Sequence, residues 1–331
     1  MRRFRALVAA FMLAVGMASA GCAPTLLPPG AARQQPEIAG QAFIAADGKR
    51  LALRAWLPEG EPKAVILALH GFNDYSNFFD DPGDFLAMRG IASYAYDQRG
   101  FGADPDAGSW AGVAAYARDA ADAALALSRR HPGVPLYMLG SSMGGAVATV
   151  ALAGNDRPPV KGVILAAPAV WGRVTMPFYQ RAALWLGAHT LPWMTLTGRG
   201  LGIVPSDNYE MLVRLGRDPL VIKETRIGTL YGLVNLMDAG LAAASALATP
   251  ALILYGEKDQ IIPKRPTRLM LESMQGPRRV ALYEGGYHML LRDLPAQTVW
   301  KDIAGWIADP AAALRSGADK RDIKHLLAAG R

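Results

Sequence analysis

The most informative stretch of this 331-residue chain reads Leu139-Gly140-Ser141-Ser142-Met143-Gly144-Gly145-Ala146. It has the pattern Gly-x-Ser-x-Gly, follows a predicted buried strand, Leu136–Leu139, and precedes a helix-like stretch, Ala146–Leu152. In this context the two glycines allow a sharp strand-to-helix turn, which lifts the central serine, Ser142, out of the end of the sheet. The helix N-terminus favours negative charge, and the backbone N–H of Met143 is placed to donate to an oxyanion. Ser142 is therefore the candidate nucleophile, and a glycine-rich turn without function is the alternative.

Short apolar runs around this motif alternate with helix-like stretches, which indicates βαβ units around a mostly parallel sheet. A run of apolar side chains at helical spacing predicts a crossover helix over Ala111–Arg130. Asp47-Gly48 lies between two alternating stretches and predicts a hairpin that pairs Gln41–Ile44 with Leu51–Trp56. The continuous buried-strand patterns are Ala64–Leu69, Ile91–Tyr96, Leu136–Leu139, Gly162–Ala166 and Ala251–Tyr255.

A long segment without a clear buried strand separates Ala167 from Ala251. Because a loop of this length needs structure of its own, we predict an inserted helical cap over residues 171–246. Its large apolar side chains are expected to form mostly the cap's own core, with a minority lining an apolar cleft. They are Trp171, Met176, Phe178, Tyr179, Trp185, Trp193, Met194, Met211, Tyr231 and Met237.

Three loops with polar side chains follow predicted strands. These loops are His70-Gly71-Phe72-Asn73-Asp74, Gly256-Glu257-Lys258-Asp259 and Gly285-Gly286-Tyr287-His288. Open α/β sheets build their sites at the carboxyl ends of strands, so we expect these loops to lie beside Ser142. The first loop could supply a second oxyanion donor, the Phe72 N–H, and the other two supply a carboxylate and an imidazole.

These features resemble the α/β-hydrolases, and within them the monoacylglycerol lipase and lysophospholipase-like group often labelled serine aminopeptidase S33. The resemblance covers roughly residues 40–308. It implies an α/β-hydrolase fold, in which a mostly parallel sheet is flanked by helices and carries an inserted helical cap. The matching residues are His70-Gly71, Tyr96-Asp97-Gln98-Arg99-Gly100-Phe101-Gly102, Gly140-Ser141-Ser142-Met143-Gly144-Gly145, Gly256-Glu257-Lys258-Asp259 and His288.

The resemblance also implies the roles of the site residues. Ser142 would be the nucleophile, His288 the general base and acid, and Asp259 the carboxylate that orients the imidazole. The backbone amides of Phe72 and Met143 would form the oxyanion hole. Together these groups predict a serine hydrolase that cleaves carboxylic esters through an acyl-enzyme, of monoacylglycerol or lysophospholipid type.

Several residues near these positions have competing interpretations. Glu257 competes with Asp259 for the carboxylate role, and Asp259 is favoured because it occupies the family's motif position. His70 is expected to be structural and to shape the oxyanion loop. Asp97 and Arg99 are interpreted as part of a structural turn.

Two alternatives to an ester hydrolase stay open. An N-terminal peptidase or amidase of the same superfamily would need carboxylates in the cap to bind the substrate ammonium group. Residues 171–245 contain five acidic residues and seven Lys or Arg residues, which mildly disfavours this alternative. A non-catalytic α/β-hydrolase that serves as a binding module is the other alternative. The chain has no His-Glu-x-x-His motif, no paired cysteines and no phosphate-binding lysine loop, so we predict no metal and no cofactor.

Residues 1–21 are typical of an export signal, because three arginines precede an apolar run and a group of small residues. The apolar run, residues 6–18, would span about 20 Å as a helix, which is short of the roughly 30 Å hydrocarbon core of a membrane. The only cysteine of the chain, Cys22, follows directly. This stretch resembles the lipobox of bacterial lipoproteins, in which the cysteine is acylated, and Cys22 is therefore the predicted lipid attachment.

The cleavage site leaves two possibilities open. Ser19 stands where the lipobox usually has leucine, and Ala18-Ser19-Ala20 offers a site for ordinary signal cleavage. In both cases the protein is exported. We expect a lipid-anchored protein on a bacterial membrane that faces the periplasm, or otherwise a periplasmic or secreted protein.

The remaining boundaries and the composition complete the prediction. Residues 22–38 would form a flexible tether, 39–170 and 247–309 the α/β-hydrolase core, and 310–331 a C-terminal extension. Hydrophobic residues make up 51% of the chain and charged residues 19%, which indicates a globular protein. The formal net charge is +7, but three of the 35 basic residues lie in the signal and no basic stripe follows, so we expect no nucleic-acid partner.

Overall fold

The computed structural model describes residues 24, 26–154, 157–198, 200 and 202–321. The predicted signal peptide, residues 1–21, and the predicted lipid attachment at Cys22 lie outside the described residues. The last ten residues of the predicted C-terminal extension, 322–331, also lie outside them.

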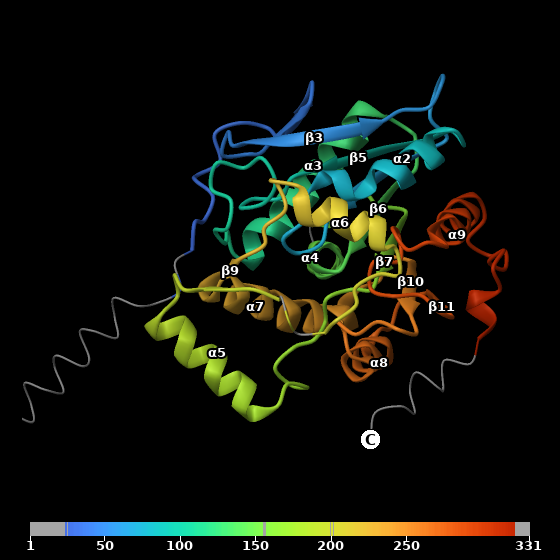
Figure 1. Cartoon of the computed structure of the whole chain (residues 1–331). Coiled ribbons are helices and arrows are strands. Elements are labelled where there is room, and N and C mark those ends of the chain that lie inside the picture. The colour runs from blue at the N-terminus through green and yellow to red at the C-terminus, as the bar shows by residue number, and fades with distance from the viewer. Residues whose placement is uncertain (1–23, 25, 155–156, 199, 201, 322–331) are drawn as a thin grey trace, which may run out of the picture.

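A nine-stranded sheet forms the centre of the described chain, in the order β1-β2-β3-β5-β4-β6-β7-β10-β11 (Figure 1). The strands from β5 to β11 in this order run parallel, whereas β1, β2 and β3 pair antiparallel. The predicted strands, the hairpin and the mostly parallel sheet are confirmed. The bounds are β1 Glu37–Ala39, β2 Ala42–Ile44, β3 Arg50–Trp56, β4 Ala64–Leu69, β5 Ile91–Tyr96, β6 Leu136–Ser141, β7 Gly162–Ala166, β10 Ala251–Gly256 and β11 Arg278–Tyr283.

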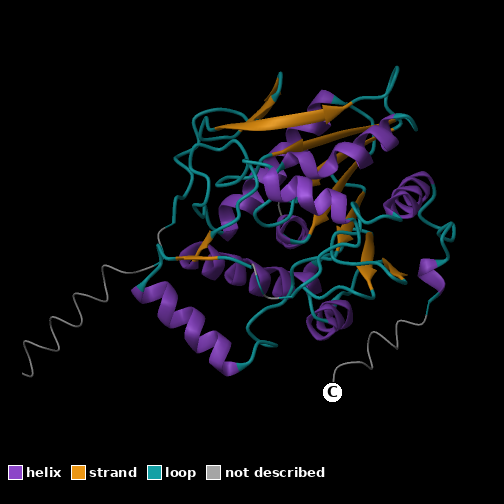
Figure 2. Ribbon diagram, in the orientation of Figure 1, coloured by secondary structure: helices purple, strands orange, loops and turns teal. Residues whose placement is uncertain are grey.

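Helices cover both faces of the sheet, because side chains alternate between the two faces along each strand (Figure 2). On β4, Val65 and Leu67 belong to one core cluster, whereas Ile66 belongs to the other. Buried side chains of α3, α4 and α8 complete the first cluster, and those of α2 and α9 complete the second. These helices are α2 Asp80–Ala87, α3 Val113–Arg130, α4 Met143–Ala153, α8 Lys264–Ser273 and α9 Ala296–Ala308, with short 3-10 helices η1 Ser76–Phe79 and η3 Ala318–Lys320.

The segment between β7 and β10 contains α5 Phe178–Thr190, β8 Thr195–Leu196, α6 Tyr209–Arg217, β9 Thr225–Arg226, α7 Ile227–Ala243 and η2 Ala244–Ala246. Helix α7 lies against α4 and contributes Val234, Leu236 and Met237 to the larger core cluster. Of the described helices, the one spanning Ile227–Ala246 is long and apolar enough to cross a membrane, yet 56% of its apolar window is buried inside the protein. Its apolar character is therefore explained by its place in the core.

The expectation that the cap's large apolar side chains mostly form its own core is wrong for five of them. Phe178, Tyr179, Trp185, Trp193 and Met194 are exposed. Helix α5 packs against α7 through a narrow side that includes Gly187, which lies against Ile227, and the buried Ala188. A single helix that packs through one side leaves its other side outside the core, and here that side is apolar.

The prediction of a flexible tether over residues 22–38 is also wrong for the part that the structure describes, because that part is hydrogen-bonded to the core. The Leu27 N–H donates to the Trp110 carbonyl at 2.9 Å, and the Arg33 N–H donates to the Ala46 carbonyl at 2.7 Å. Its last two residues lie in β1. Backbone pairing of this kind does not depend on side chains, so a Pro- and Ala-rich composition could not reveal it. The segment is a strap fixed along the core.

The described part of the C-terminal extension packs against the core as well. Leu314 and Ala318 are buried in the second cluster, and the Arg279 guanidinium on β11 donates to Asp319 Oδ2 at 3.0 Å. These contacts cover the last strand of the sheet, where an open edge would otherwise be exposed.

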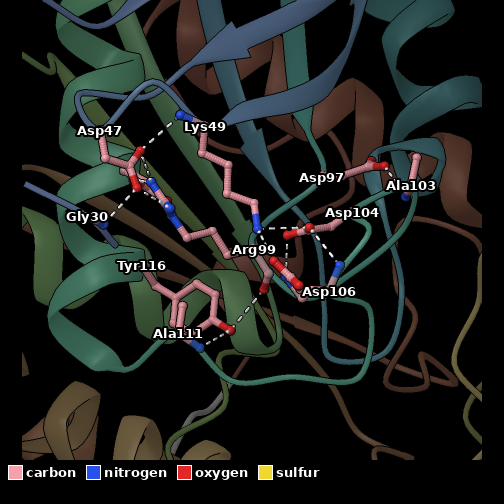
Figure 3. A network of polar contacts seen from close by, with 12 residues as sticks. Gly30, Asp47, Lys49, Asp97, Arg99, Ala103, Asp104, Asp106, Ala111 and Tyr116 are labelled. Atoms are coloured by element: carbon pink, nitrogen blue, oxygen red, sulfur yellow. Dashed lines mark hydrogen bonds and ion pairs between the residues drawn. The ribbon is translucent and has the colours of Figure 1, made fainter. Parts of the chain in front are cut away.

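An ion-pair network braces the β2–β3 hairpin against α3 (Figure 3). The Arg99 guanidinium donates to Asp119 Oδ2 at 2.6 Å and to both Asp47 oxygens at 2.8 and 2.9 Å. Lys49 pairs with Asp104 at 2.9 Å and with Asp106 at 2.8 Å. The hydrogen bond from Arg99 lowers the pKa of Asp47 to about 2. Arg99 is therefore structural here, as the sequence indicates.

Replacement of Arg99 by methionine should destabilise the fold strongly. It leaves the buried Asp119 carboxylate without its cationic partner, so we expect a loss of about 3–5 kcal/mol in the free energy of unfolding. Urea unfolding measures the change. As a control, Arg214→Met removes an exposed pair with Glu210 on α6 and should cost less than about 1 kcal/mol. Equal losses in both variants would contradict a bracing role for Arg99.

Candidate active site

Ser142 lies at a strained turn between β6 and α4. Its backbone has φ 50° and ψ −113°, in the left-handed region that a serine rarely adopts. The turn is tight, because a Cβ at Gly140 would lie 2.3 Å from the Gly144 carbonyl oxygen and one at Gly144 only 2.1 Å from that of Leu69. The two glycines of the motif are therefore required by close backbone contacts, and the turn holds Ser142 at the carboxyl end of the parallel strands.

His288 and Asp259 meet beside this end of the sheet. Asp259 follows β10 and His288 follows β11, and these two strands are parallel neighbours. The His288 Nδ1–H donates to Asp259 Oδ2 at 2.8 Å. The other carboxylate oxygen, Oδ1, accepts the N–H groups of Ile261 at 2.8 Å and Ile262 at 3.0 Å. Because both oxygens of the buried carboxylate are held in place, the imidazole has a fixed orientation with Nε2 left to accept a proton.

Glu257, the competing carboxylate, does not reach His288. Its carboxylate pairs with Arg321 at 3.9 Å, and 39% of its side chain is exposed. The structure therefore brings Asp259 rather than Glu257 to the imidazole.

The two predicted oxyanion donors are available. In the part of the chain that the structure describes, neither the Phe72 N–H nor the Met143 N–H donates a hydrogen bond. Gly71 lies directly against the nucleophile, since a Cβ there would be 3.4 Å from Ser142 Cβ. The loop that carries Phe72 thus passes next to Ser142, and Met143 starts the helix behind it.

His70 holds this loop from behind. The side chain is fully buried, its Nε2 accepts the Gln98 N–H at 2.9 Å, and its Nδ1 lies 2.8 Å from the Gly71 carbonyl oxygen. Because the Gln98 amide can only donate, Nδ1 must carry the proton and donate to Gly71. Burial lowers the pKa of His70, which agrees with a neutral ring. His70 therefore fixes the backbone next to Phe72 and has no free nitrogen for proton transfer.

Ser142 and His288 both line a cavity of about 680 Å³. No hydrogen bond joins their side chains among the described residues, and such contacts often tighten only when substrate binds. The walls are mainly apolar and come from the core and from the segment between β7 and β10. Its apolar lining includes Phe72, Phe78, Trp171, Met176, Leu184 and Leu233.

A few polar side chains interrupt this apolar lining. Arg292 Nη1 donates to Asp74 Oδ2 at 2.9 Å, and both side chains are almost buried. Gln180 and Gln260 also line the cavity. The cavity is therefore suited to a long apolar group with a small polar group at one place.

Sequence reasoning missed a link between the cap and the His288 loop. The buried Asp293 accepts the Ser206 hydroxyl with Oδ1 at 2.7 Å and the Tyr287 N–H with Oδ2 at 2.8 Å. The Met289 N–H donates to the Pro205 carbonyl at 3.0 Å. The cap is thus hydrogen-bonded on both sides of His288. No motif surrounds Ser206 or Asp293, so only the three-dimensional structure reveals this link.

The order of the strands and the glycine-flanked turn after β6 define an α/β-hydrolase. Residues 60–295 match the family described as serine aminopeptidase, S33, and the chain belongs to this family. The predicted resemblance to the monoacylglycerol lipase-like group is confirmed by its relatives, and the chain is a serine ester hydrolase.

Three similar proteins illustrate the relationship. The mouse monoglyceride lipase is 29% identical over 283 residues, which cover 83% of this chain and 92% of that protein. The monoacylglycerol lipase of Mycolicibacterium smegmatis is 25% identical, with 80% and 95% covered. The solved structure of a soluble variant of the Saccharomyces cerevisiae monoglyceride lipase has a TM-score of 0.64 at 20% identity, with 86% and 97% covered. This last similarity shows the fold.

Proposed function

We propose that the protein hydrolyses monoacylglycerols to a free fatty acid and glycerol. The observation that carries this proposal is the large apolar cavity that contains Ser142 and His288. An acyl chain would bury apolar surface along Trp171, Leu184 and Leu233, which favours binding in proportion to the area removed from water. The names of the mouse and mycobacterial relatives support the same substrate class.

The polar lining favours an uncharged head group over a phosphate. Among the described residues that line the cavity, the Lys or Arg side chain is Arg292, and its charge is neutralised by Asp74. A lysophospholipid phosphate would have to compete with this carboxylate, whereas the hydroxyl groups of glycerol can hydrogen-bond to either partner. This supports monoacylglycerol over lysophospholipid.

The same lining argues against the peptidase alternative. A site for a substrate ammonium group needs a carboxylate that is not already paired. Among the described residues that line the cavity, the one carboxylate is Asp74, and it is held by Arg292. Among the described residues, the cavity lining therefore offers no unpaired carboxylate to an N-terminal amine.

The proposed mechanism uses the groups that meet at the end of the sheet. Ser142 Oγ attacks the ester carbonyl carbon while His288 Nε2 takes the hydroxyl proton, and Asp259 holds the resulting imidazolium. The Phe72 and Met143 N–H groups donate to the oxyanion. The tetrahedral intermediate then expels glycerol, which receives the proton from His288. A water molecule, deprotonated by His288, attacks the acyl-enzyme and releases the fatty acid.

Hydrolysis rates on three substrates test this proposal. We expect high kcat/KM on monooleoylglycerol, much lower kcat/KM on lysophosphatidylcholine, and no turnover of an aminoacyl p-nitroanilide, with no activity in Ser142→Ala. Preference for the anilide would favour the peptidase. A folded protein that binds monooleoylglycerol without turnover would instead favour the non-catalytic binding module.

We also propose that the protein is exported and anchored to a bacterial membrane through an acyl group on Cys22. The signal-like residues 1–21 and the position of the only cysteine directly after them support this. Labelling cells with radioactive palmitate should mark the parent chain and not Cys22→Ser. An unlabelled parent chain whose mature N-terminus is Gly21 would show ordinary signal cleavage and a free exported protein.

Asp293→Leu should slow turnover, although Asp293 does not touch the cavity. A leucine of similar shape can accept neither hydrogen bond, so the Tyr287 amide and the Ser206 hydroxyl both lose this partner. We expect kcat on a soluble ester to fall about tenfold to a hundredfold, because His288 is less well positioned, with a smaller change in KM. Ser206→Ala should also lower kcat more than it changes KM, but by a smaller factor. A pure KM effect in both variants would contradict this positioning role.

A further inference from the structure

The turn that contains the oxyanion donor Phe72 is closed only weakly by its own backbone. The Asp74 N–H donates to the Gly71 carbonyl at 3.3 Å, which is long for a backbone hydrogen bond, and Asn73 has φ 63°, in the left-handed region. A trans peptide holds its carbonyl and its N–H in one plane, so whatever fixes the Gly71 carbonyl also orients the Phe72 N–H. His70 holds this carbonyl from the core side. The other end of the turn, at Asn73, needs a support of its own.

The cap supplies this support. The Ile222 N–H donates to the Asn73 carbonyl at 3.0 Å, and Asn73 Nδ2 donates to Thr225 Oγ1 at 2.6 Å. Asn73 Oδ1 is buried and has no hydrogen-bond partner in the part of the chain that the structure describes, so the contact with Thr225 is what fixes the amide group. One residue of the turn is thus bonded to the cap through both its backbone and its side chain.

The cap segment that makes these contacts is itself held in place. The Tyr75 hydroxyl donates to Asp218 Oδ2 at 2.8 Å. Burial and this carboxylate raise the pKa of Tyr75 to about 12, so the hydroxyl stays protonated and donates at neutral pH. Thr225 lies in β9, which pairs with β8, and Ile222 packs against the larger core cluster. Residues 218–225 therefore form a fixed support along the outer side of the turn.

The turn is held between this support and the core, away from the substrate. The Phe72 ring centroid lies 5.7 Å from that of Phe101 and 6.4 Å from that of Trp110. Neither Asn73 nor Thr225 is among the described residues that line the cavity. A change at either position therefore acts on the reaction through the turn, and it should alter kcat rather than KM.

We propose that Asn73 and Thr225 are positioning residues for the oxyanion hole, and that their contact holds the Phe72 N–H in the orientation that donates to the oxyanion. The donor is then in place only while cap residues 222–225 lie on the turn, so the cap takes part in the chemical step as well as in binding the acyl chain. The role of the pair rests on the proposed mechanism, in which the Phe72 N–H stabilises the oxyanion. It does not depend on which ester is the substrate.

Thr225→Val tests the contact from the cap side, because it removes the hydroxyl and leaves the sequence of the turn unchanged. We expect kcat on p-nitrophenyl butyrate to fall about tenfold, since a displaced donor stabilises the transition state less, with KM within about twofold of the parent value. Thr225→Ser keeps a hydroxyl and should restore most of the rate. The matched control is Thr195→Val on the neighbouring β8, an exposed residue outside the described cavity lining, which should keep the parent rate. An unchanged kcat in folded Thr225→Val would overturn the proposal.

Asn73→Gly tests the same contact from the side of the turn. Glycine adopts a positive φ without strain, so the backbone can keep its shape while the amide group is lost. Because each variant removes the same contact, the double variant Asn73→Gly/Thr225→Val should be no slower than either single variant. Losses that multiply in the double variant would show that the two residues act separately, which would contradict the pair.

The ionisation of a bound transition-state analogue reports on the oxyanion hole directly. Ser142 Oγ adds to the carbonyl carbon of an alkyl trifluoromethyl ketone, its proton passes to His288 Nε2, and the carbonyl oxygen becomes the oxyanion of a hemiketal. With a ¹³C-labelled carbonyl, the chemical shift against pH gives the pKa of this hemiketal. Since N–H donors favour the charged form, we expect this pKa to be about one unit higher in Thr225→Val than in the parent, and unchanged in Thr195→Val. A lower unfolding temperature of Thr225→Val with an unchanged hemiketal pKa would reduce the contact to a structural role and overturn the proposal.

Failure of the proposed function would give a different result. A parent chain that hydrolyses p-nitrophenyl butyrate but not monooleoylglycerol would contradict the proposed substrate, and the loss of kcat in Thr225→Val would still support the positioning role. A parent chain that forms no hemiketal on Ser142 would contradict the mechanism and the role of the pair together.

Discussion

Ser142→Ala should lower kcat on p-nitrophenyl butyrate by about 10⁴-fold or more. The serine hydroxyl forms the covalent intermediate, so its loss leaves only the oxyanion donors and substrate binding to assist attack by water. Initial rates at equal protein concentration measure the effect. The fold should be unaffected. The turn already holds a side chain at φ 50° in the parent, and the two glycines that its close backbone contacts require are still present in the variant.

Ser245→Ala provides the matched control. This serine is exposed after α7, its hydroxyl donates to the Ala242 carbonyl, and it is not among the described residues that line the cavity. Its replacement should leave the rate at the parent value. If Ser142→Ala kept more than a tenth of the parent activity, another group would have to be the nucleophile.

Asp259→Asn should reduce kcat on the same ester by about 10⁴-fold near neutral pH. The carboxylate accepts the His288 Nδ1–H at 2.8 Å, and its other oxygen is held by the Ile261 and Ile262 amides. Those amides require an acceptor, so the asparagine keeps its oxygen toward them and presents its NH₂ group to His288. A donor at this place favours the ring tautomer with the proton on Nε2, which cannot accept a proton from Ser142.

Glu257→Gln separates this effect from a general loss of negative charge in the loop. Glu257 is two residues away in the same turn, is partly exposed and pairs with Arg321 rather than with His288. We expect activity within about twofold of the parent, since exposed charges contribute little at this distance. If Glu257→Gln lost as much activity as Asp259→Asn, the assignment of the carboxylate would be wrong.

The central part of the fold could be predicted from the sequence, because it rests on short-range patterns. A buried parallel strand such as Ala64–Leu69 is a continuous apolar run. The turn around Ser142 needs glycine at the two positions where any side chain would collide with a neighbouring carbonyl oxygen. The loops that carry Asp259 and His288 follow adjacent strands, so the rule that sites form at strand ends brings them together.

Features that depend on long-range packing could not be predicted. The cap's apolar residues, such as Trp185 and Phe178, have the composition of a core, and only the position of α5 outside α7 shows that they are exposed. The strap from Pro24 onward is fixed by backbone hydrogen bonds, which leave no trace in side-chain patterns. The Ser206–Asp293 contact joins residues 87 positions apart, and no local motif marks either.

The most direct test of the proposed mechanism is peptide mapping after reaction with a long-chain alkyl fluorophosphonate, which modifies only an activated serine. We predict a single adduct on Ser142, absent from Ser142→Ala and formed far more slowly in His288→Gln. An adduct on Ser141 or another serine, or a folded parent chain that takes up no reagent, would contradict the assignment of Ser142, His288 and Asp259 as the groups that cleave the ester.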